Sequence, residues 1–215
     1  MNMSNKTINI STGRKKQKAS ILKWEWRFIA KCYLALAYVG IKELKKRIYC
    51  KKQSFLWSVS TQVYDAKLLL IPILWNIKHA IELVLKAHSV TFQKRYLKTH
   101  DLCDLKNDLS EVFDIKNQGE DKKFDEFACI VNKYYKLEVF NGKILNFQTT
   151  FDTDNDILRY PEKNNTNYKL NLRAFMKITE KELEELQKDI ELINRCITFP
   201  AEYKHLKQHW PSFSK

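Results

Sequence analysis

Apolar side chains recur three or four positions apart along most of this chain, and this spacing constrains the fold more than any other feature. It is clearest at positions 179–196, where four apolar residues fall on one face of a helix: Leu183, Leu186, Ile190 and Ile193. Thr179 and Glu182 form a capping-box pattern at the start of this run. With only 4 Gly and 4 Pro, the chain has few residues for the tight turns of an all-β protein. The sequence therefore predicts a mostly helical fold.

Other segments have the same period and predict further helices at about 21–50, 55–70, 72–89, 101–113 and 124–140. Pro72 either kinks a continuous helix or occupies the first turn of a new one, and we expect a new helix. Thr99 is the expected N-cap of the helix over 101–113. Near-alternation of apolar residues around Tyr168 favours a β-hairpin or irregular insertion near 143–177.

The two ends of the chain differ in composition from the helical part. Residues 1–19 are polar and contain a cluster of four cations: Arg14, Lys15, Lys16 and Lys18. We expect a flexible basic arm there, which either seeks phosphate or is a terminus of no consequence. One helical domain should span 20–197, followed by an aromatic and basic tail over 198–215.

The formal net charge of +13 favours polyanionic partners such as RNA, DNA or an anionic membrane, although a solvated lysine-rich surface also explains it. Five cysteines are scattered without a CxxC pair, so we expect reduced, mostly buried thiols and no metal site or cofactor. The apolar run over 28–41 is interrupted by Lys31 and is too short to span a bilayer. These features predict a cytoplasmic protein without a membrane partner.

Three ionisable residues lie three and four positions apart on the helix expected over 72–89. His79, Glu82 and Lys86 would project from neighbouring positions on one face. They would form either a solvent-facing, salt-bridged stripe or a polar wall that lines a substrate-binding cleft.

The next link carries Arg95 and His100, with Lys94 and Lys98 as further cations. RNA is cut without a metal when its 2′-hydroxyl attacks the adjacent phosphorus, if one group moves protons and a cation stabilises the crowded phosphate. Histidine and arginine fit these two roles, and helix N-terminal amides add anion-binding donors. The same spacing also arises by chance, and His100 beside Asp101 would then simply help to cap a helix.

A third candidate feature is the arginine that precedes a rigid turn at Arg159-Tyr160-Pro161. It is either a further substrate-binding residue or a surface arginine stacked on Tyr160.

Together, the run HAIELVLKAH, the following KTHDL and the downstream RYP resemble the HEPN family over about residues 55–195. This family consists of small helical domains of prokaryotic toxins, defence proteins and nucleotidyltransferase partners. The resemblance implies an all-α, antiparallel bundle of four to five helices that is frequently a homodimer. Active members are metal-independent endoribonucleases with an Arg-x4-6-His motif, which Arg95 and His100 match, and in dimers the two motifs meet in one basic cleft.

The chain departs from the active pattern in two ways. Active members usually carry a polar residue directly after the arginine, where this chain has Tyr96. His100 also coincides with the HDL motif of members without demonstrated cleavage. In that second branch, a nucleotide-binding or partner-binding surface is implied for Glu82, Lys86, His100, Asp101 and Arg159.

The sequence thus leads to two main functional hypotheses, with a purely structural helical adaptor, whose side chains here are capped and solvated, as a third possibility. The first is an RNA-directed, metal-independent endoribonuclease of toxin or anti-phage defence type, in which His100 does acid–base work and Arg95 stabilises phosphate. The second is a non-catalytic module that binds a nucleotide, nucleic acid or a cognate protein such as an antitoxin or nucleotidyltransferase. The remaining candidate residues would bind substrate: His79, Glu82, Lys86, Lys94, Lys98, Asp101 and Arg159.

Overall fold

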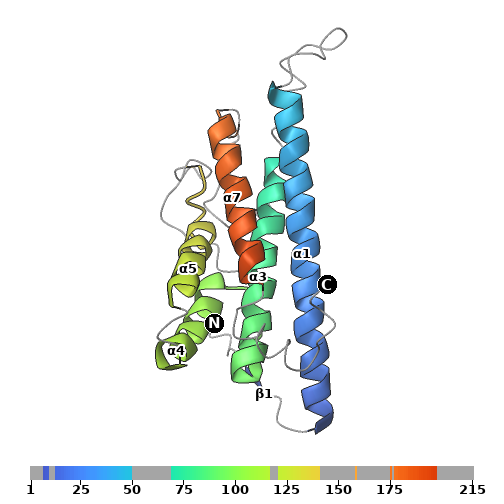
Figure 1. Cartoon of the computed structure of the whole chain (residues 1–215), viewed down its shortest axis with the longest axis vertical. Coiled ribbons are helices and arrows are strands. Elements are labelled where there is room, and N and C mark those ends of the chain that lie inside the picture. The colour runs from blue at the N-terminus through green and yellow to red at the C-terminus, as the bar shows by residue number, and fades with distance from the viewer. Residues whose placement is uncertain are drawn as a thin grey trace, which may run out of the picture.

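Long helices lie side by side along the molecule (Figure 1). The computed structural model describes residues 7–9, 13–49, 69–116, 121–140, 158, 175 and 177–197. These ranges contain, in chain order, β1 (Thr7–Asn9), α1 (Gly13–Tyr49), α3 (Leu70–Gln93), β2 (Arg95–Leu97), α4 (Leu102–Lys116), α5 (Asp121–Tyr135) and α7 (Glu180–Cys196). The all-α bundle is confirmed. Most of the helix expected over 55–70, most of the insertion expected near 143–177, and the tail over 198–215 lie outside the described residues.

Helix α3 is the centre of the bundle, since it contacts α1, α4, α5 and α7. It runs antiparallel to α1 (Figure 1). Leu74, Ile77, Ile81 and Leu85 are fully buried, and so are polar residues of the same helix, including Lys78 and His88. Pro72 lies in the first turn of α3, where its missing N–H removes no intrahelical hydrogen bond. The expected new helix at Pro72 is therefore confirmed, with its start at Leu70.

Parts of the arm expected over 1–19 form regular secondary structure, in β1 and in the first turns of α1. Helix α1 begins at Gly13, so the basic cluster at 14–18 lies in its first turns. Strand β1 pairs antiparallel with β2, with Ile8 opposite Tyr96 and Asn9 opposite Arg95. The Tyr96 ring also packs edge-on against Trp26 of α1, with 4.9 Å between centroids. The partner of β1 lies almost ninety residues away, so local composition gives no sign of this pairing.

Two helix ends show how the sequence sets element boundaries. The capping box of α7 is present as expected, because Thr179 Oγ1 accepts from the Glu182 amide and the Glu182 carboxylate accepts from the Thr179 amide. Helix α5 ends at Tyr135, earlier than the expected 140. The amide of Glu138 donates to the Lys133 carbonyl and that of Leu137 to the Tyr134 carbonyl, which is a Schellman motif. Leu137 has the left-handed φ of 51° that this motif requires.

Close contacts join α1 to α3 and α5 to α7. A Cβ atom on Gly40 of α1 would lie 2.8 Å from Cγ1 of Ile73, so glycine permits the close approach of α1 and α3. Asp189 of α7 accepts from Lys133 Nζ at 2.6 Å and from the Tyr134 hydroxyl at 3.0 Å, which ties α5 to α7.

None of the described helices is long and apolar enough to cross a bilayer. Four of the five cysteines lie in described segments, and they are free thiols. Cys196 is buried and Cys103 half-buried, whereas Cys32 and Cys129 are exposed. The expectation of mostly buried thiols is thus wrong, because Cys32 and Cys129 lie on outward faces of α1 and α5.

Candidate acid–base site

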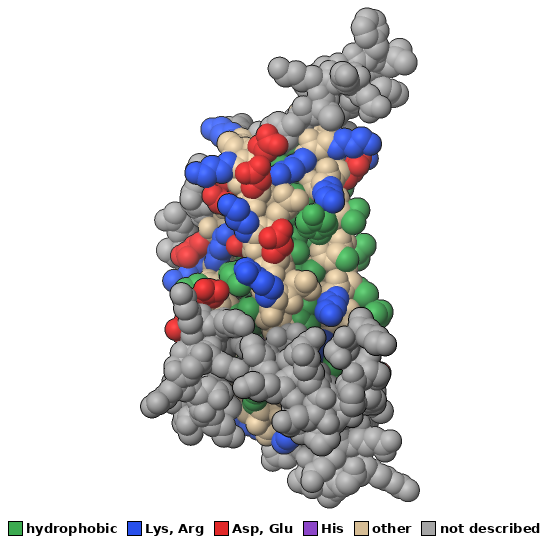
Figure 2. Space-filling model, viewed as in Figure 1, with side chains coloured by type: hydrophobic (Ala, Val, Ile, Leu, Met, Phe, Trp, Pro, Cys, Tyr) green, Lys and Arg blue, Asp and Glu red, His purple; other side chains and the backbone are tan. Residues whose placement is uncertain are grey.

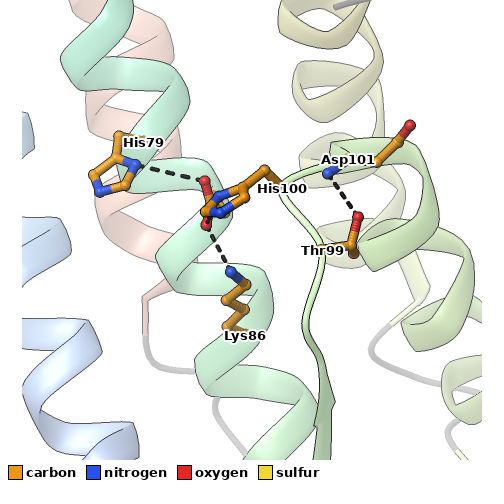
Figure 3. A network of polar contacts seen from close by, with 6 residues as sticks. His79, Lys86, Thr99, His100 and Asp101 are labelled. Carbon is orange, nitrogen blue, oxygen red and sulfur yellow. Dashed lines mark hydrogen bonds and ion pairs between the residues drawn. The ribbon is translucent and has the colours of Figure 1, made fainter. Parts of the chain in front are cut away.

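Three basic side chains, those of His79, Lys86 and His100 (labelled in Figure 3), contact the buried carboxylate of Glu82. Its Oε1 lies 2.7 Å from Lys86 Nζ and 3.0 Å from His100 Nδ1, and its Oε2 lies 3.5 Å from His79 Nδ1. His79 and Lys86 come from the turns of α3 on either side of Glu82, as the spacing predicts. His100 comes from the link between β2 and α4 and reaches Glu82 across space. We call these four residues the Glu82 cluster.

The Glu82 cluster is not a solvent-facing stripe. The Glu82 side chain is 2% exposed and that of Lys86 is 12% exposed, because neighbouring helices cover α3 over most of its length. The His79 ring also contacts two aromatic rings: it stacks on Trp75 with 5.1 Å between centroids and lies edge-on to Tyr33 of α1 at 4.8 Å. The outer member is His100, whose side chain is 65% exposed.

Glu82 is ionised at neutral pH despite its burial. Burial is the largest influence and acts to raise the pKa, but hydrogen bonds and charge interactions with His79, Lys86 and His100 outweigh it and lower the pKa to about 2. The site therefore contains a permanent buried anion that needs its basic neighbours.

The ionised carboxylate dictates how His100 carries its protons. A carboxylate only accepts hydrogen bonds, so His100 must donate through Nδ1–H. In neutral His100 the lone pair then resides on Nε2 of an exposed ring. A histidine that is oriented through one nitrogen and open at the other has the arrangement of a general acid–base group.

Arg95 is held by a different carboxylate. Its Nη2 lies 2.7 Å from Oδ1 of Asp108 on α4, and Asp108 Oδ2 also accepts from Ser89 Oγ at 3.5 Å. Ser89 lies seven residues after Glu82 on α3, which is about 10 Å along a helix. Arg95 and His100 are therefore held by two different carboxylates, that of Asp108 on α4 and that of Glu82 on α3.

The flanking candidates have roles in local structure. Lys94 is the left-handed C-cap of α3, with φ 60°, and its Nζ donates to the Thr91 carbonyl at 2.6 Å. Lys98 is exposed. Asp101, not Thr99, caps α4, because its Oδ1 accepts from the amides of Cys103 at 2.7 Å and Asp104 at 3.1 Å. These two amides are thereby occupied by the Asp101 carboxylate.

Asp101 is itself partly buried. This burial is the main cause that raises its pKa, against the opposing hydrogen bonds from the Asp104 and Cys103 amides. Thr99 contributes to the cap indirectly, since its Oγ1 accepts from the Asp101 amide at 3.0 Å.

Sequence reasoning missed Asp108, the counter-ion of Arg95. A signal was present, because Asp108 follows Leu105 and precedes Leu109 on the apolar side of its helix, where a carboxylate needs a cationic partner. Arg159 lies outside the described residues.

Within the described ranges, no group of three or more His, Cys, Asp and Glu side chains is arranged to hold a metal ion. Comparison with protein-family models, curated proteins and solved structures found no match.

Proposed function

We propose that this chain is a cytoplasmic, RNA-directed HEPN-like protein, a metal-independent endoribonuclease of toxin or anti-phage defence type, in which His100 moves the proton. The observation that supports this most is the 3.0 Å contact between His100 Nδ1 and buried Glu82, on an imidazole that is 65% exposed. Glu82 is a positioning residue in this scheme, and the net charge of +13 favours approach of a polyanion.

The reaction needs only groups that the chain and the RNA supply. The ribose 2′-oxygen forms a bond to the adjacent phosphorus as the bond from phosphorus to the 5′-oxygen breaks. Nε2 of His100 takes the proton from the 2′-hydroxyl, and the departing 5′-oxygen receives a proton from the site or from water. The products are a 2′,3′-cyclic phosphate end and a 5′-hydroxyl end.

Arg95 is the candidate for stabilising the phosphate charge. Its contact with Asp108 uses Nη2, and a guanidinium carries five N–H donors, so donors remain for a phosphate oxygen. Its side chain is 31% exposed. Asp108 would then set the direction of the guanidinium.

The decisive experiment is cleavage of single-stranded RNA in EDTA, with analysis of the product ends. Wild type should yield 2′,3′-cyclic phosphate ends. His100→Ala should abolish cleavage and keep the helical circular dichroism spectrum, whereas His205→Ala, a histidine substitution in the C-terminal tail, should cleave as wild type. Unchanged cleavage by folded His100→Ala would overturn the proposal.

A second function, a non-catalytic module that binds nucleotide, RNA or a cognate partner protein, is favoured by one observation. Within one protomer, Arg95 and His100 are held by different carboxylates, that of Asp108 on α4 and that of Glu82 on α3, so they do not converge on a common hydrogen-bond partner. This module would bind labelled RNA or nucleotide in a salt-dependent way without cutting RNA. Intact RNA in the EDTA assay, with saturable binding by fluorescence anisotropy, would decide for it.

A further inference from the structure

The outward side of α1 carries an apolar stripe that the described helices leave uncovered. The large exposed hydrophobic side chains of the described residues all belong to this helix: Trp24 (41% exposed), Phe28 (68%), Ile29 (40%), Leu36 (60%) and Val39 (62%). Cys32 and Ala35, which are smaller and also exposed, lie between them. Figure 2 shows apolar side chains gathered along the edge of the molecule that α1 forms. These seven residues are called the α1 stripe below.

The stripe lies opposite the face that α1 presents to the core. Ala30, Leu34, Ala37 and Ile41 are buried and face inward, and α3 packs on their side. The stripe extends over sixteen residues, about 24 Å of helix. A contiguous exposed apolar surface of this kind marks an interaction site more often than a chance feature of a monomer.

The spacing within the stripe is that of a helix–helix seam. Phe28, Cys32, Ala35 and Val39 follow one another at intervals of four, three and four residues, the 3.5-residue repeat that lets one helix pack along another. Larger side chains stand at the two ends of this seam and smaller ones at its centre, so its middle permits close approach of a partner helix.

Size and charge are arranged symmetrically about the midpoint of the seam, between residues 33 and 34. An antiparallel copy of α1 would place Phe28 against Val39 and Cys32 against Ala35 of the second copy. The exposed Glu25 and Lys42 lie equally far from this midpoint on opposite sides, so the same arrangement joins them as two opposite-charge pairs. A parallel arrangement in register would oppose Glu25 with Glu25 and Lys42 with Lys42.

We infer that the α1 stripe binds a second copy of this chain, with the two α1 helices antiparallel about a two-fold axis near residues 33–34. The occupant is a copy of the same chain because the side-chain sizes of the four seam residues and the flanking charges of Glu25 and Lys42 are complementary to themselves when the helix is reversed. This dimer differs from the one that the HEPN resemblance implies. With both α1 helices between the two α3 helices, three helix–helix spacings separate the latter by roughly 25 Å, so the His100 side chains are not pooled.

The first test is the oligomeric state of the full chain by sedimentation equilibrium. Wild type should be a dimer, and Phe28→Glu should raise the dimer dissociation constant at least about tenfold, since a buried unpaired charge costs more than the 1.4 kcal/mol that this factor represents. Cys129→Glu, the same acid at an exposed position of α5, should leave the dimer unchanged. Because Phe28 is 68% exposed in the monomer, the variant should stay folded. A monomeric wild type, or a dimer that Phe28→Glu does not weaken, would overturn the inference.

Charge reversal tests the orientation. Glu25→Lys alone and Lys42→Glu alone should each weaken the dimer, because each places like charges opposite one another, and the double variant should restore it. In a parallel dimer, neither the single variants nor the double variant would change the like-charge pattern. A double variant that fails to recover wild-type affinity after both single variants have lost it would rule out the antiparallel arrangement.

Disulfide formation tests the register of the two α1 helices. Two proteins are mixed, and both carry Cys50→Ser and Cys129→Ser. The first keeps Cys32, and the second has Cys32→Ser and Ala35→Cys. On oxidation they should form a mixed disulfide dimer, because residues 32 and 35 lie opposite one another only in the antiparallel seam. Mixing two chains avoids a link within one helix. Absence of the mixed dimer under conditions where sedimentation shows association would contradict the proposed register.

Discussion

His100 Nδ1 lies 3.0 Å from Oε1 of Glu82, which joins an exposed imidazole to a carboxylate that is 2% exposed. The two residues are eighteen positions apart and come from different elements, so the fold, rather than a local motif, creates the pair. Because Glu82 is an ionised acceptor, the pair fixes the tautomer of neutral His100 and leaves the lone pair on Nε2.

Replacing Glu82 should change stability in a pH-dependent way. The pKa of Glu82 in the folded protein is about 2, below the ordinary 4.5, so ionised Glu82 stabilises the fold above pH 4.5 and this stabilisation is lost as the pH falls toward 2. This pKa shift means that ionised Glu82 contributes on the order of 3 kcal/mol to the free energy of unfolding. Glu82→Gln should therefore be less stable than wild type by about this amount at pH 7 in urea unfolding, and the difference should narrow below pH 4.5.

Lys86 provides the control for that prediction. Glu82→Gln leaves the largely buried Lys86 ammonium without its carboxylate partner, whereas Glu82→Gln/Lys86→Met removes both charges of the pair. The double variant should recover part of the lost stability. An equal gap between wild type and Glu82→Gln at pH 7 and pH 2.5 would contradict the assigned role of the Glu82 charge.

His88 should make folding sensitive to mild acid. This side chain is fully buried, and its Nε2 contacts the Cys196 carbonyl oxygen at 2.8 Å. Burial, assisted by the nearby Arg27 charge, lowers the pKa of His88 to about 3. The unfolded chain takes up a proton below about pH 6.5 and the folded chain does not, so stability should fall as the pH drops from 6.5 toward 3.

The expected loss from His88 alone is about 2 kcal/mol between pH 7 and pH 5. His88→Gln keeps a side-chain N–H that can donate toward Cys196 and removes the titrating ring. Urea unfolding of this variant should show a smaller drop between the two pH values, even if its stability at pH 7 is lower. A drop as large as that of wild type would show that another group is responsible.

The close approach of α1 and α3 predicts that Gly40→Ala is destabilising. Alanine favours helix by about 1 kcal/mol over glycine, but its Cβ would meet Ile73 Cγ1 at 2.8 Å, and overpacking of this kind costs about 1–3 kcal/mol. In an Ile73→Ala background the clashing atoms are absent, so Gly40→Ala should become stabilising there. Thermal or urea unfolding of the four proteins measures this coupling, and a stabilising Gly40→Ala in wild type would contradict it.

The features predicted correctly from the sequence depend on contacts between residues that are close in the chain. The capping box and the apolar period of α7 involve neighbours within four residues, and the contacts of His79 and Lys86 with Glu82 follow from helix geometry. These features need no knowledge of the tertiary fold.

Distant contacts explain the rest. The burial of Glu82 arises because α3 is surrounded by other helices, and β1 exists because β2 offers it a partner. The Arg95–Asp108 pair likewise joins β2 to α4. The spacing of Arg95 and His100 in the sequence therefore could not predict that Asp108 is the counter-ion of Arg95. Asp101 took the capping role expected of Thr99 because its carboxylate reaches two amides of the first turn of α4.

The most direct test of the account is a double-mutant cycle between Glu82 and His100, with RNA cleavage rates in EDTA as the readout. If Glu82 acts by positioning His100, His100→Ala should abolish cleavage, Glu82→Gln should reduce it, and the double variant should be no slower than His100→Ala alone. All rates should be taken at a temperature where circular dichroism shows each variant folded. Cleavage that persists in folded His100→Ala, or losses that simply add, would contradict the claim that this pair carries the proton transfer.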